Sequence, residues 1–217
     1  GGSKNTISGG NFNKVSNDPE LVEEFSTISG GRYNAITDSS YSVITGGGAE
    51  QTATGELGRQ NIIYGCDRST ISGGKRNHIF ESESSGNTGN TMTGGFFHTI
   101  RDSEKHSAIT GGRANTINAN GGRSVVAGGE FNHAFGTNSL AFGQNAVTLY
   151  KHSMVVNLLG GEDKDDVLTG TEDGEFLVTA ESFRFQIGNG NGNDGNDSIE
   201  LTKTNMQNLL TAFEEEE

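Results

Sequence analysis

Residues 107–144 read SAITGGRANTINANGGR (107–123), SVVAGGEFNHAFGTN (124–138) and SLAFGQ (139–144), three successive copies of one short unit. Each copy places an aliphatic residue between small residues, continues with Gly or Gly-Gly, and then has an Asn followed by a second apolar residue. The same unit recurs upstream at 5–15, 26–36, 42–52, 69–79 and 90–100, with a shorter copy, NIIYGCD, at 61–67. A unit repeated this often predicts a solenoid.

The unit has the pattern of two short strands and two corners. In Ser-Thr-Ile-Ser (26–29) the Ile lies on one face and its neighbours on the other, as in a half-buried strand. The Gly pair permits a positive φ at the first corner. The Asn that follows suits a left-handed turn or a side-chain bond to the backbone, at Asn13, Asn34, Asn77, Asn115 and Asn132. A second strand carries Val15, Ile36, Ile79, Ile100, Ile117 or Ala134, so the sequence predicts an all-β, parallel β-roll or β-helix.

The predicted core of a single chain is thin. Each turn offers about two aliphatic side chains, each worth roughly 1.5–3 kcal/mol when buried. Fixing the backbone costs roughly 1–2 kcal/mol for each of the turn's residues. We therefore expect several chains to associate, with a homotrimer as the favoured state and the Ile columns meeting at the shared axis.

Two of the quoted segments resemble a known family. SLAFGQNAV (139–147) and residues 124–138 resemble the head repeats of trimeric autotransporter adhesins, and the G-G-x-x-N-x-I form is similar to repeats of bacteriophage and large-virus tail-fibre proteins. The resemblance covers residues 5–148. It implies a trimeric left-handed parallel β-roll at a virion surface or another extracellular site, with host attachment by receptor binding as its role. The variable unit length and the Gly-Gly pairs favour the tail-fibre variety over a bacterial adhesin head.

Composition and charge exclude several classes of protein. The chain has 217 residues with 34 Gly, one Cys and a net charge of −13, of which residues 160–217 contribute −12. Such an acidic segment repels phosphate backbones, so we expect no nucleic-acid partner. No stretch approaches the ~18 apolar residues of a membrane span, so we expect no membrane insertion. The lone Cys66 rules out an intrachain disulfide framework and is interpreted as a buried structural thiol.

The residue that follows the Gly pair by two places is aromatic in several copies, and basic residues lie beside it. Outward-facing rings would suit stacking on sugars or on a protein receptor, whereas inward-facing rings would serve inter-chain packing, the commoner role. The possible receptor surface therefore comprises Arg32, Tyr33, Arg76, Phe97, Arg113 and Phe131, with Phe12 and Lys75 beside it. We expect a host glycan or a host protein as the ligand.

The Gly-rich repeat is no longer recognisable after residue 152, where we place the end of the repeat domain (1–152). MVVNLL (154–159) and GEFLVTAESFRFQIG (174–188) alternate more strongly, which predicts a β-cap over 153–200 in which FLVTA and FRFQI take part. Met206, Leu209, Leu210 and Phe213 form the apolar stripe of an amphipathic helix, predicted for 201–217.

The residues predict little chemistry. GGEDKDDVL (160–168) partly matches a calcium-binding nonapeptide, which makes Asp163, Asp165 and Asp166 weak calcium candidates, although an acidic hairpin turn is the favoured interpretation. The histidines (78, 98, 106, 133, 152) show no metal-ligand spacing, and stacked surface positions explain 78, 98 and 133. No nucleophile lies with a base, so the chain is expected not to be an enzyme and to need no cofactor. A glycan-degrading tailspike and a calcium-binding secreted repeat protein remain alternatives. Ice binding is not favoured, because the outward Ser and Thr form no unbroken Thr-x-Thr ladder.

Overall fold

The computed structural model describes residues 4–16, 25–48, 61–80, 89–101, 106–118, 122–159, 167–180, 182–187 and 197–202. These residues form strands and turns and contain no helix. The chain divides into two compact units, Gly1–Val178 and Thr179–Glu217.

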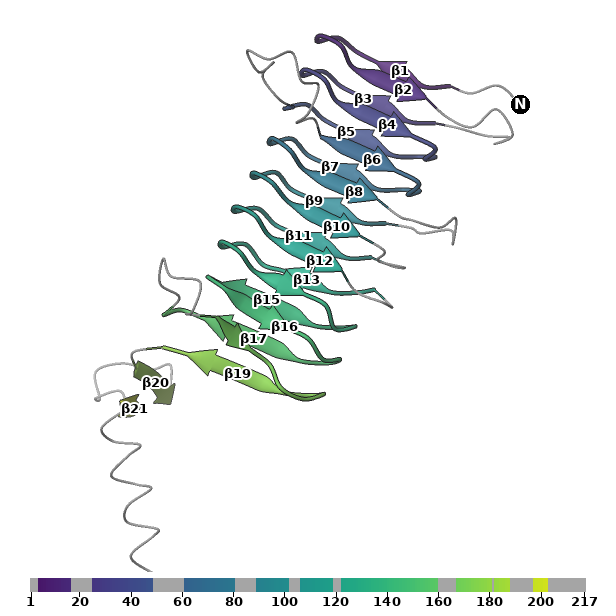
Figure 1. Ribbon diagram of the computed structural model, residues 1–217. Coiled ribbons are helices and arrows are strands. Elements are labelled where there is room, and N and C mark those ends of the chain that lie inside the picture. The colour runs from purple at the N-terminus through teal and green to yellow at the C-terminus, as the bar shows by residue number, and fades with distance from the viewer. Residues whose placement is uncertain are drawn as a thin grey trace, which may run out of the picture. The chain divides into compact units, whose positions relative to one another are not determined.

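The first unit is built from two parallel sheets, visible in Figure 1 as a ladder of short strands. The first sheet contains β1 (Thr6–Ile7), β3 (Thr27–Ile28), β5 (Val43–Ile44), β7 (Thr70–Ile71), β9 (Thr91–Met92), β11 (Ala108–Ile109), β13 (Val125–Val126), β15 (Leu140–Gly143), β17 (Met154–Asn157) and β19 (Phe176–Thr179). The second sheet contains β2 (Lys14–Ser16), β4 (Ala35–Thr37), β6 (Ile62–Tyr64), β8 (His78–Phe80), β10 (Thr99–Arg101), β12 (Thr116–Asn118), β14 (His133–Ala134), β16 (Ala146–Thr148) and β18 (Leu168–Thr169).

Each strand pairs in parallel with the equivalent strand of the next turn, as Ile28 does with Ile44 in the first sheet and Ile36 with Ile63 in the second. The chain therefore winds from one sheet to the other and back in every turn. This winding confirms the predicted parallel β-solenoid. The hand of the coil and the homotrimer stay predictions.

The core lies between the two sheets of a single chain. Two columns of aliphatic side chains fill it with no exposed surface: Ile28, Ile44, Ile71, Met92, Ile109 and Val126 from the first sheet, and Ile36, Ile63, Ile79, Ile100 and Ile117 from the second. The alternation read from the sequence is thus confirmed. The expectation that the Ile columns meet at an axis shared by several chains is wrong, because the two sheets of one chain already bury them.

A ladder of asparagines runs beside the second Ile column. The Nδ2 of Asn77 donates to the Gly73 carbonyl of its own turn at 3.0 Å and to the Gly95 carbonyl of the next turn at 3.2 Å. The Oδ1 of Asn115 accepts the backbone N–H of Asn132 at 2.9 Å. The predicted side-chain bonds to the backbone are confirmed. They satisfy the buried polar groups at the corner, which would otherwise cost stability.

The second glycine of each pair lies where two turns approach most closely. Gly112 has φ +92, and a Cβ there would collide with the carbonyl of Gly129 in the next turn. Gly111 has φ +125, but a Cβ there would meet no atom within 4 Å. Only the second position is therefore closed to side chains by its neighbours.

The segment NIIYGCD is not a separate copy of the unit. Its strand β6 belongs to the second sheet and completes the turn that begins with β5. Gly65 lies at the opposite corner, where its N–H donates to the carbonyl of Thr37 at 3.1 Å. Cys66 is buried, as predicted, and its thiol lies 3.2 Å from the Tyr64 carbonyl.

Strands β17, β18 and β19 continue the two sheets beyond residue 152. FLVTA lies in and directly after β19, whereas FRFQI lies in β20 (Ser182–Ile187), which pairs antiparallel with β21 (Asp197–Thr202). The two segments expected to build one cap therefore pair with different strands. The cap and the proposed domain boundaries stay predictions. Of the helical tail expected over 201–217, residues 201 and 202 belong instead to strand β21, and residues 203–217 lie outside the described residues.

Candidate functional site

The corner after each Gly pair forms one long edge of the solenoid, here called the glycine edge. Two side chains per turn reach it: a bridging residue and a left-handed residue. Parallel bridges join the bridging residues of neighbouring turns, in the runs Asn11, Arg32, Gly48 and Lys75, Phe96, Arg113, Glu130, Gln144. Equivalent side chains therefore follow one another at about 4.8 Å, the spacing of neighbouring strands.

The left-handed residues have an unusual backbone conformation. Their φ values are +54° at Phe12, +55° at Tyr33, +61° at Arg76, +66° at Phe97 and +56° at Phe131. This conformation costs a bulky residue about 1–2 kcal/mol. Asn tolerates it better, and the turn after that of Phe131 places Asn145 there with φ +55°, while the turn before it has Ala114 with φ +54°. Large side chains kept at a strained position point to a functional reason for them.

The aromatic rings of this column mostly face solvent. Phe12, Phe97 and Phe131 are 67%, 54% and 39% exposed, whereas Tyr33 is only 9% exposed. The Tyr33 ring stacks on Phe12 with centroids 4.9 Å apart and planes inclined by 3°. The structure therefore places most of these rings at the outer corner of the single chain. Their roles in receptor binding or in packing between chains both stay predictions.

The predicted arginines lie over these rings. The Arg113 guanidinium lies 5.2 Å from the centre of Phe131, and its Nε is 2.9 Å from Oε1 of Glu130. Arg76 lies 5.1 Å from the centre of Phe96 and 5.9 Å from that of Phe97. Arg32 lies 5.9 Å from the Tyr33 ring centre.

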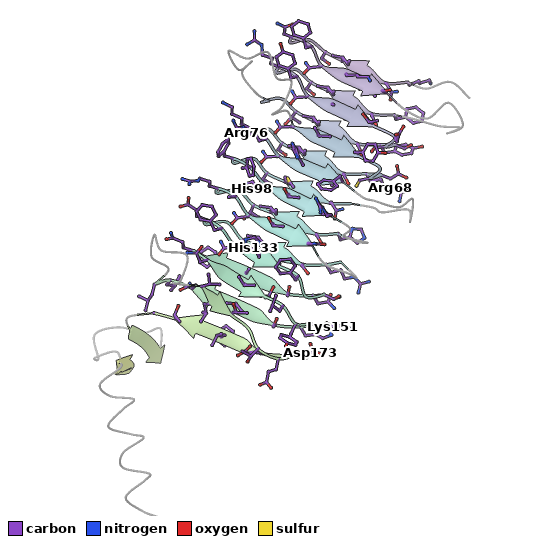
Figure 2. The ribbon with its side chains drawn as sticks, in the orientation of Figure 1. Arg68, Arg76, His98, His133, Lys151 and Asp173 are labelled. Carbon is purple, nitrogen blue, oxygen red and sulfur yellow. The ribbon has the colours of Figure 1, made fainter. Side chains whose placement is uncertain are left out.

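All six residues of the predicted receptor surface thus lie on one edge. Figure 2 shows Arg76 on this edge and Arg68 on the opposite one. These residues are far apart in the sequence, and the winding of the chain brings them to the same edge because each turn places its corner beside that of the previous turn.

A groove of about 540 Å³ opens at the C-terminal part of the glycine edge. It is lined by Arg113, Glu130, Phe131, His133, Gln144, Asn145, Val147 and Val167. The volume falls in the range of small-ligand sites. The sequence predicted only Arg113 and Phe131. Glu130 and Gln144 occupy the same position in their turns as Arg113 does in its own. This equivalence in the repeat could have predicted them as further residues of the site.

His133 forms part of the groove wall. Its ring stacks on Phe135 with centroids 5.8 Å apart and planes 9° apart. Burial lowers the pKa of His133, so its imidazole is neutral at pH 7. Among the described residues that line it, the groove therefore contains one ion pair, Arg113 with Glu130, and no further charged side chain.

The expectation that His98 is a surface residue is wrong. Its side chain is fully buried and takes the place of an asparagine in the ladder. Its Nδ1 accepts the N–H of Asn115 at 3.1 Å. Burial lowers the pKa of His98 to about 4, although hydrogen bonds with Gly112 and Asn115 oppose the shift. His78 and His133 lie in one column of the second sheet and are half-buried.

The outer face of the first sheet carries hydroxyl groups in register. One column is formed without interruption by the exposed residues Ser8, Ser29, Thr45, Ser72, Thr93 and Thr110. The neighbouring column contains Thr6, Thr27, Thr70 and Thr91 and is interrupted by Val43. The sequence predicted no unbroken Thr-x-Thr ladder. The column with Val43 is indeed interrupted, whereas the column from Ser8 to Thr110 has a hydroxyl group, from Ser or Thr, in each of its six turns.

The described residues show no metal centre. They contain no group of three or more His, Cys, Asp or Glu side chains able to hold an ion. Asp163, Asp165 and Asp166 lie outside the described residues, so the calcium hypothesis stays a prediction. In the part of the chain that is described, no helix is long and apolar enough to cross a membrane.

The fold and its edge place the chain in a structural class, the parallel β-solenoids. Beyond that class, no protein family, curated protein or solved structure matches the chain.

Proposed function

We propose that this chain is a non-enzymatic, homotrimeric fibre module of a virion, which attaches to a host surface through the glycine edge. The observation that carries the proposal is the set of exposed rings and arginines on that edge, above all Arg113 over Phe131. Aromatic faces bind sugar rings and apolar receptor surfaces, and arginines bind their polar groups.

The repeat itself supports attachment. Because one turn follows another at about 4.8 Å, the same kind of contact is offered several times along a single ligand. Several weak contacts made at once give a much higher overall affinity than any one of them. A long, regular edge is therefore suited to an extended or multivalent host ligand.

Binding is tested with an array of host-surface glycans and with isolated host-surface proteins. The triple variant Arg76→Ala, Phe97→Ala, Arg113→Ala is expected to lose binding at least about tenfold, because each removed contact is worth roughly a factor of several to ten. Arg68→Ala, on the opposite edge, is the matched control. Equal binding by the triple variant, or release of new reducing ends from a bound glycan, would contradict the proposal.

The second outcome is the signature of a glycan-degrading tailspike. Such hydrolases use two carboxylates on either side of the scissile bond. Among the described residues that line the groove, Glu130 carries the single carboxylate.

The homotrimer has its own support. Near the C-terminal end of the first sheet the outer face becomes apolar, with Leu140 beside Met154 on neighbouring strands. Phe142, Met154 and Phe176 are 39%, 36% and 68% exposed there. Contact with further copies of the chain would remove this surface from water.

Light scattering on the purified chain tests the trimer. The double variant Leu140→Glu, Met154→Glu is expected to shift the mass toward that of one chain, whereas Thr91→Glu, on the same face within the hydroxyl columns, should not. A single-chain mass for the unaltered protein at micromolar concentration would contradict the trimer and leave the binding edge to be judged by its own test.

A second candidate function is favoured by the unbroken hydroxyl column of the first sheet. The hydroxyl groups of this column follow one another at about 4.8 Å, the spacing of neighbouring strands, and a regular array of this kind is one that an ice surface could match. Thermal hysteresis of the purified chain tests this candidate, and loss of the effect in Thr45→Tyr would assign it to this face. Absence of hysteresis would remove it.

A further inference from the structure

The glycine edge is positively charged on a chain that is strongly acidic. Among its described residues it carries Arg32, Lys75, Arg76 and Arg113, opposed by Glu130 alone. Residues 160–217 contribute −12 of the chain's net charge of −13, so the part of the chain that carries this edge is nearly neutral. A cluster of cations on a nearly neutral body favours anionic ligands at this edge.

The cations of the bridging column recur at every second turn. Arg32 is bridged to Gly48, whose N–H donates to the Gly74 carbonyl at 2.9 Å, so that Lys75 belongs to the following turn. Phe96 is then bridged to both Lys75 and Arg113. Arg32, Lys75 and Arg113 are therefore separated by two turns each, which corresponds to about 9–10 Å.

Phe96 lies between Lys75 and Arg113 in the bridging column, and the neighbouring Phe97 is 54% exposed. The guanidinium of Arg76, from the left-handed column, lies 5.1 Å from the centre of Phe96 and 5.9 Å from that of Phe97. At Arg113 the ion pair with Glu130 engages Nε and holds the guanidinium over Phe131. The Nη groups of Arg113, whose side chain is 58% exposed, are left as donors to an anionic group.

We propose that the glycine edge binds an extended acidic polysaccharide that carries one anionic group on every second sugar ring. The anionic groups meet Lys75 and Arg113, while the sugar ring between them lies against the exposed Phe97 side chain and the Arg76 guanidinium that stacks over Phe96. This inference rests on the proposed function and specifies the ligand class of the same edge. A nucleic acid offers a phosphate at every nucleotide and is repelled by the acidic remainder of the chain, so it fits the wide spacing less well.

Hyaluronan, with a carboxylate on alternate rings, is the first probe, and polygalacturonate, with one on every ring, is the second. Dextran and single-stranded poly-dT are the neutral and nucleic-acid probes. We expect hyaluronan to bind, with an affinity that falls as salt rises. Lys75→Ala and Arg113→Ala should each weaken binding about tenfold, and Arg68→Ala should leave it unchanged.

The spacing is tested at constant charge. In the double variant Phe96→Arg, Arg113→Ala the two cations lie on adjacent turns, about 4.8 Å apart instead of about 9–10 Å. This variant should lose preference for hyaluronan relative to polygalacturonate, with circular dichroism confirming that it is folded. An unchanged preference would overturn the inference, as would equal binding of dextran or tighter binding of poly-dT.

The outcomes separate this inference from the proposed function. Binding of a neutral host glycan that is lost in Phe97→Ala but kept in Lys75→Ala supports attachment through the edge and overturns the acidic ligand. Failure to bind any glycan or host-surface protein overturns both. Hyaluronan binding that persists in Lys75→Ala and Arg113→Ala overturns the assignment to this edge.

Discussion

The Nδ1 atom of His98 accepts a hydrogen bond of 3.1 Å from the backbone N–H of Asn115, one turn further along the solenoid. Toward the preceding turn, the backbone N–H of His98 donates to Oδ1 of Asn77 at 3.1 Å. An imidazole thus occupies one position in a column of asparagines. It can serve as an acceptor only while it is neutral, which agrees with its lowered pKa of about 4.

His98 makes the stability of the solenoid depend on pH. Its pKa is about 4 in the folded chain and 6.5 when exposed, so between these values the unfolded chain binds the extra proton. Stability from this residue is complete above about pH 6.5 and falls as the pH is lowered to 4, by at most about 3 kcal/mol. Urea unfolding at pH 7 and pH 4.5 should show a smaller loss for His98→Asn than for the unaltered chain.

The exposed His152 provides the control for this experiment, because His152→Asn changes the same residue type outside the ladder. Equal acid sensitivity of His98→Asn and the unaltered chain would show that the carboxylates, and not His98, cause the loss.

Asn77 supports three hydrogen bonds at a buried corner, to Gly73, Gly95 and His98. Asn77→Ala removes the acceptor of the His98 N–H and the side-chain donor to Gly73 and Gly95, although the Gly95 carbonyl keeps its bond from the Lys75 N–H. We expect a loss of about 2–4 kcal/mol. Asn118→Ala, on the half-buried outer side of β12, is the matched substitution and should cost less than about 1 kcal/mol. Similar midpoints in denaturant for the two variants would contradict a structural role of the ladder.

Substitutions at Gly111 and Gly112 allow the cost of a strained backbone to be measured separately from the cost of a steric clash with the next turn. Both have a positive φ, but only at Gly112 would a Cβ collide with the next turn. Gly111→Ala should cost about 1–2 kcal/mol through strain. Gly112→Ala should cost ~4 kcal/mol or more, which is exceptional for one substitution. Thermal melts of both variants measure the difference, and equal melting temperatures would show that the turns can move apart.

Phe131 combines a strained backbone with an exposed ring. Phe131→Asn relieves the left-handed strain, as Asn145 does in the next turn, but removes the contact with Arg113. The two effects are each worth about 1 kcal/mol and oppose one another. We therefore expect nearly unchanged stability together with weakened ligand binding. A stability loss above about 2 kcal/mol would show instead that the ring is needed for the fold.

Particular residues show how far the sequence could be interpreted. Ile28 and Ile36 were predicted as core because they lie between small residues at a fixed distance from the Gly pair, a local pattern. NIIYGCD was misassigned because the second strand of a turn resembles the first when each consists of two or three residues. His98 was placed on the surface, although its alignment with Asn77 in GGFFHTI and GGKRNHI was a usable signal.

The sequence by itself determined the repeating unit, its strands and corners, and which residues lie at the corner. Each of these features depends on neighbours within a few residues. Only the tertiary structure decided that one chain closes its own core and that Glu130 pairs with Arg113. It alone also set the alternation of cations along the edge. These features depend on how the coil aligns one turn with the next, and that alignment is decided by bonds between residues about one turn apart.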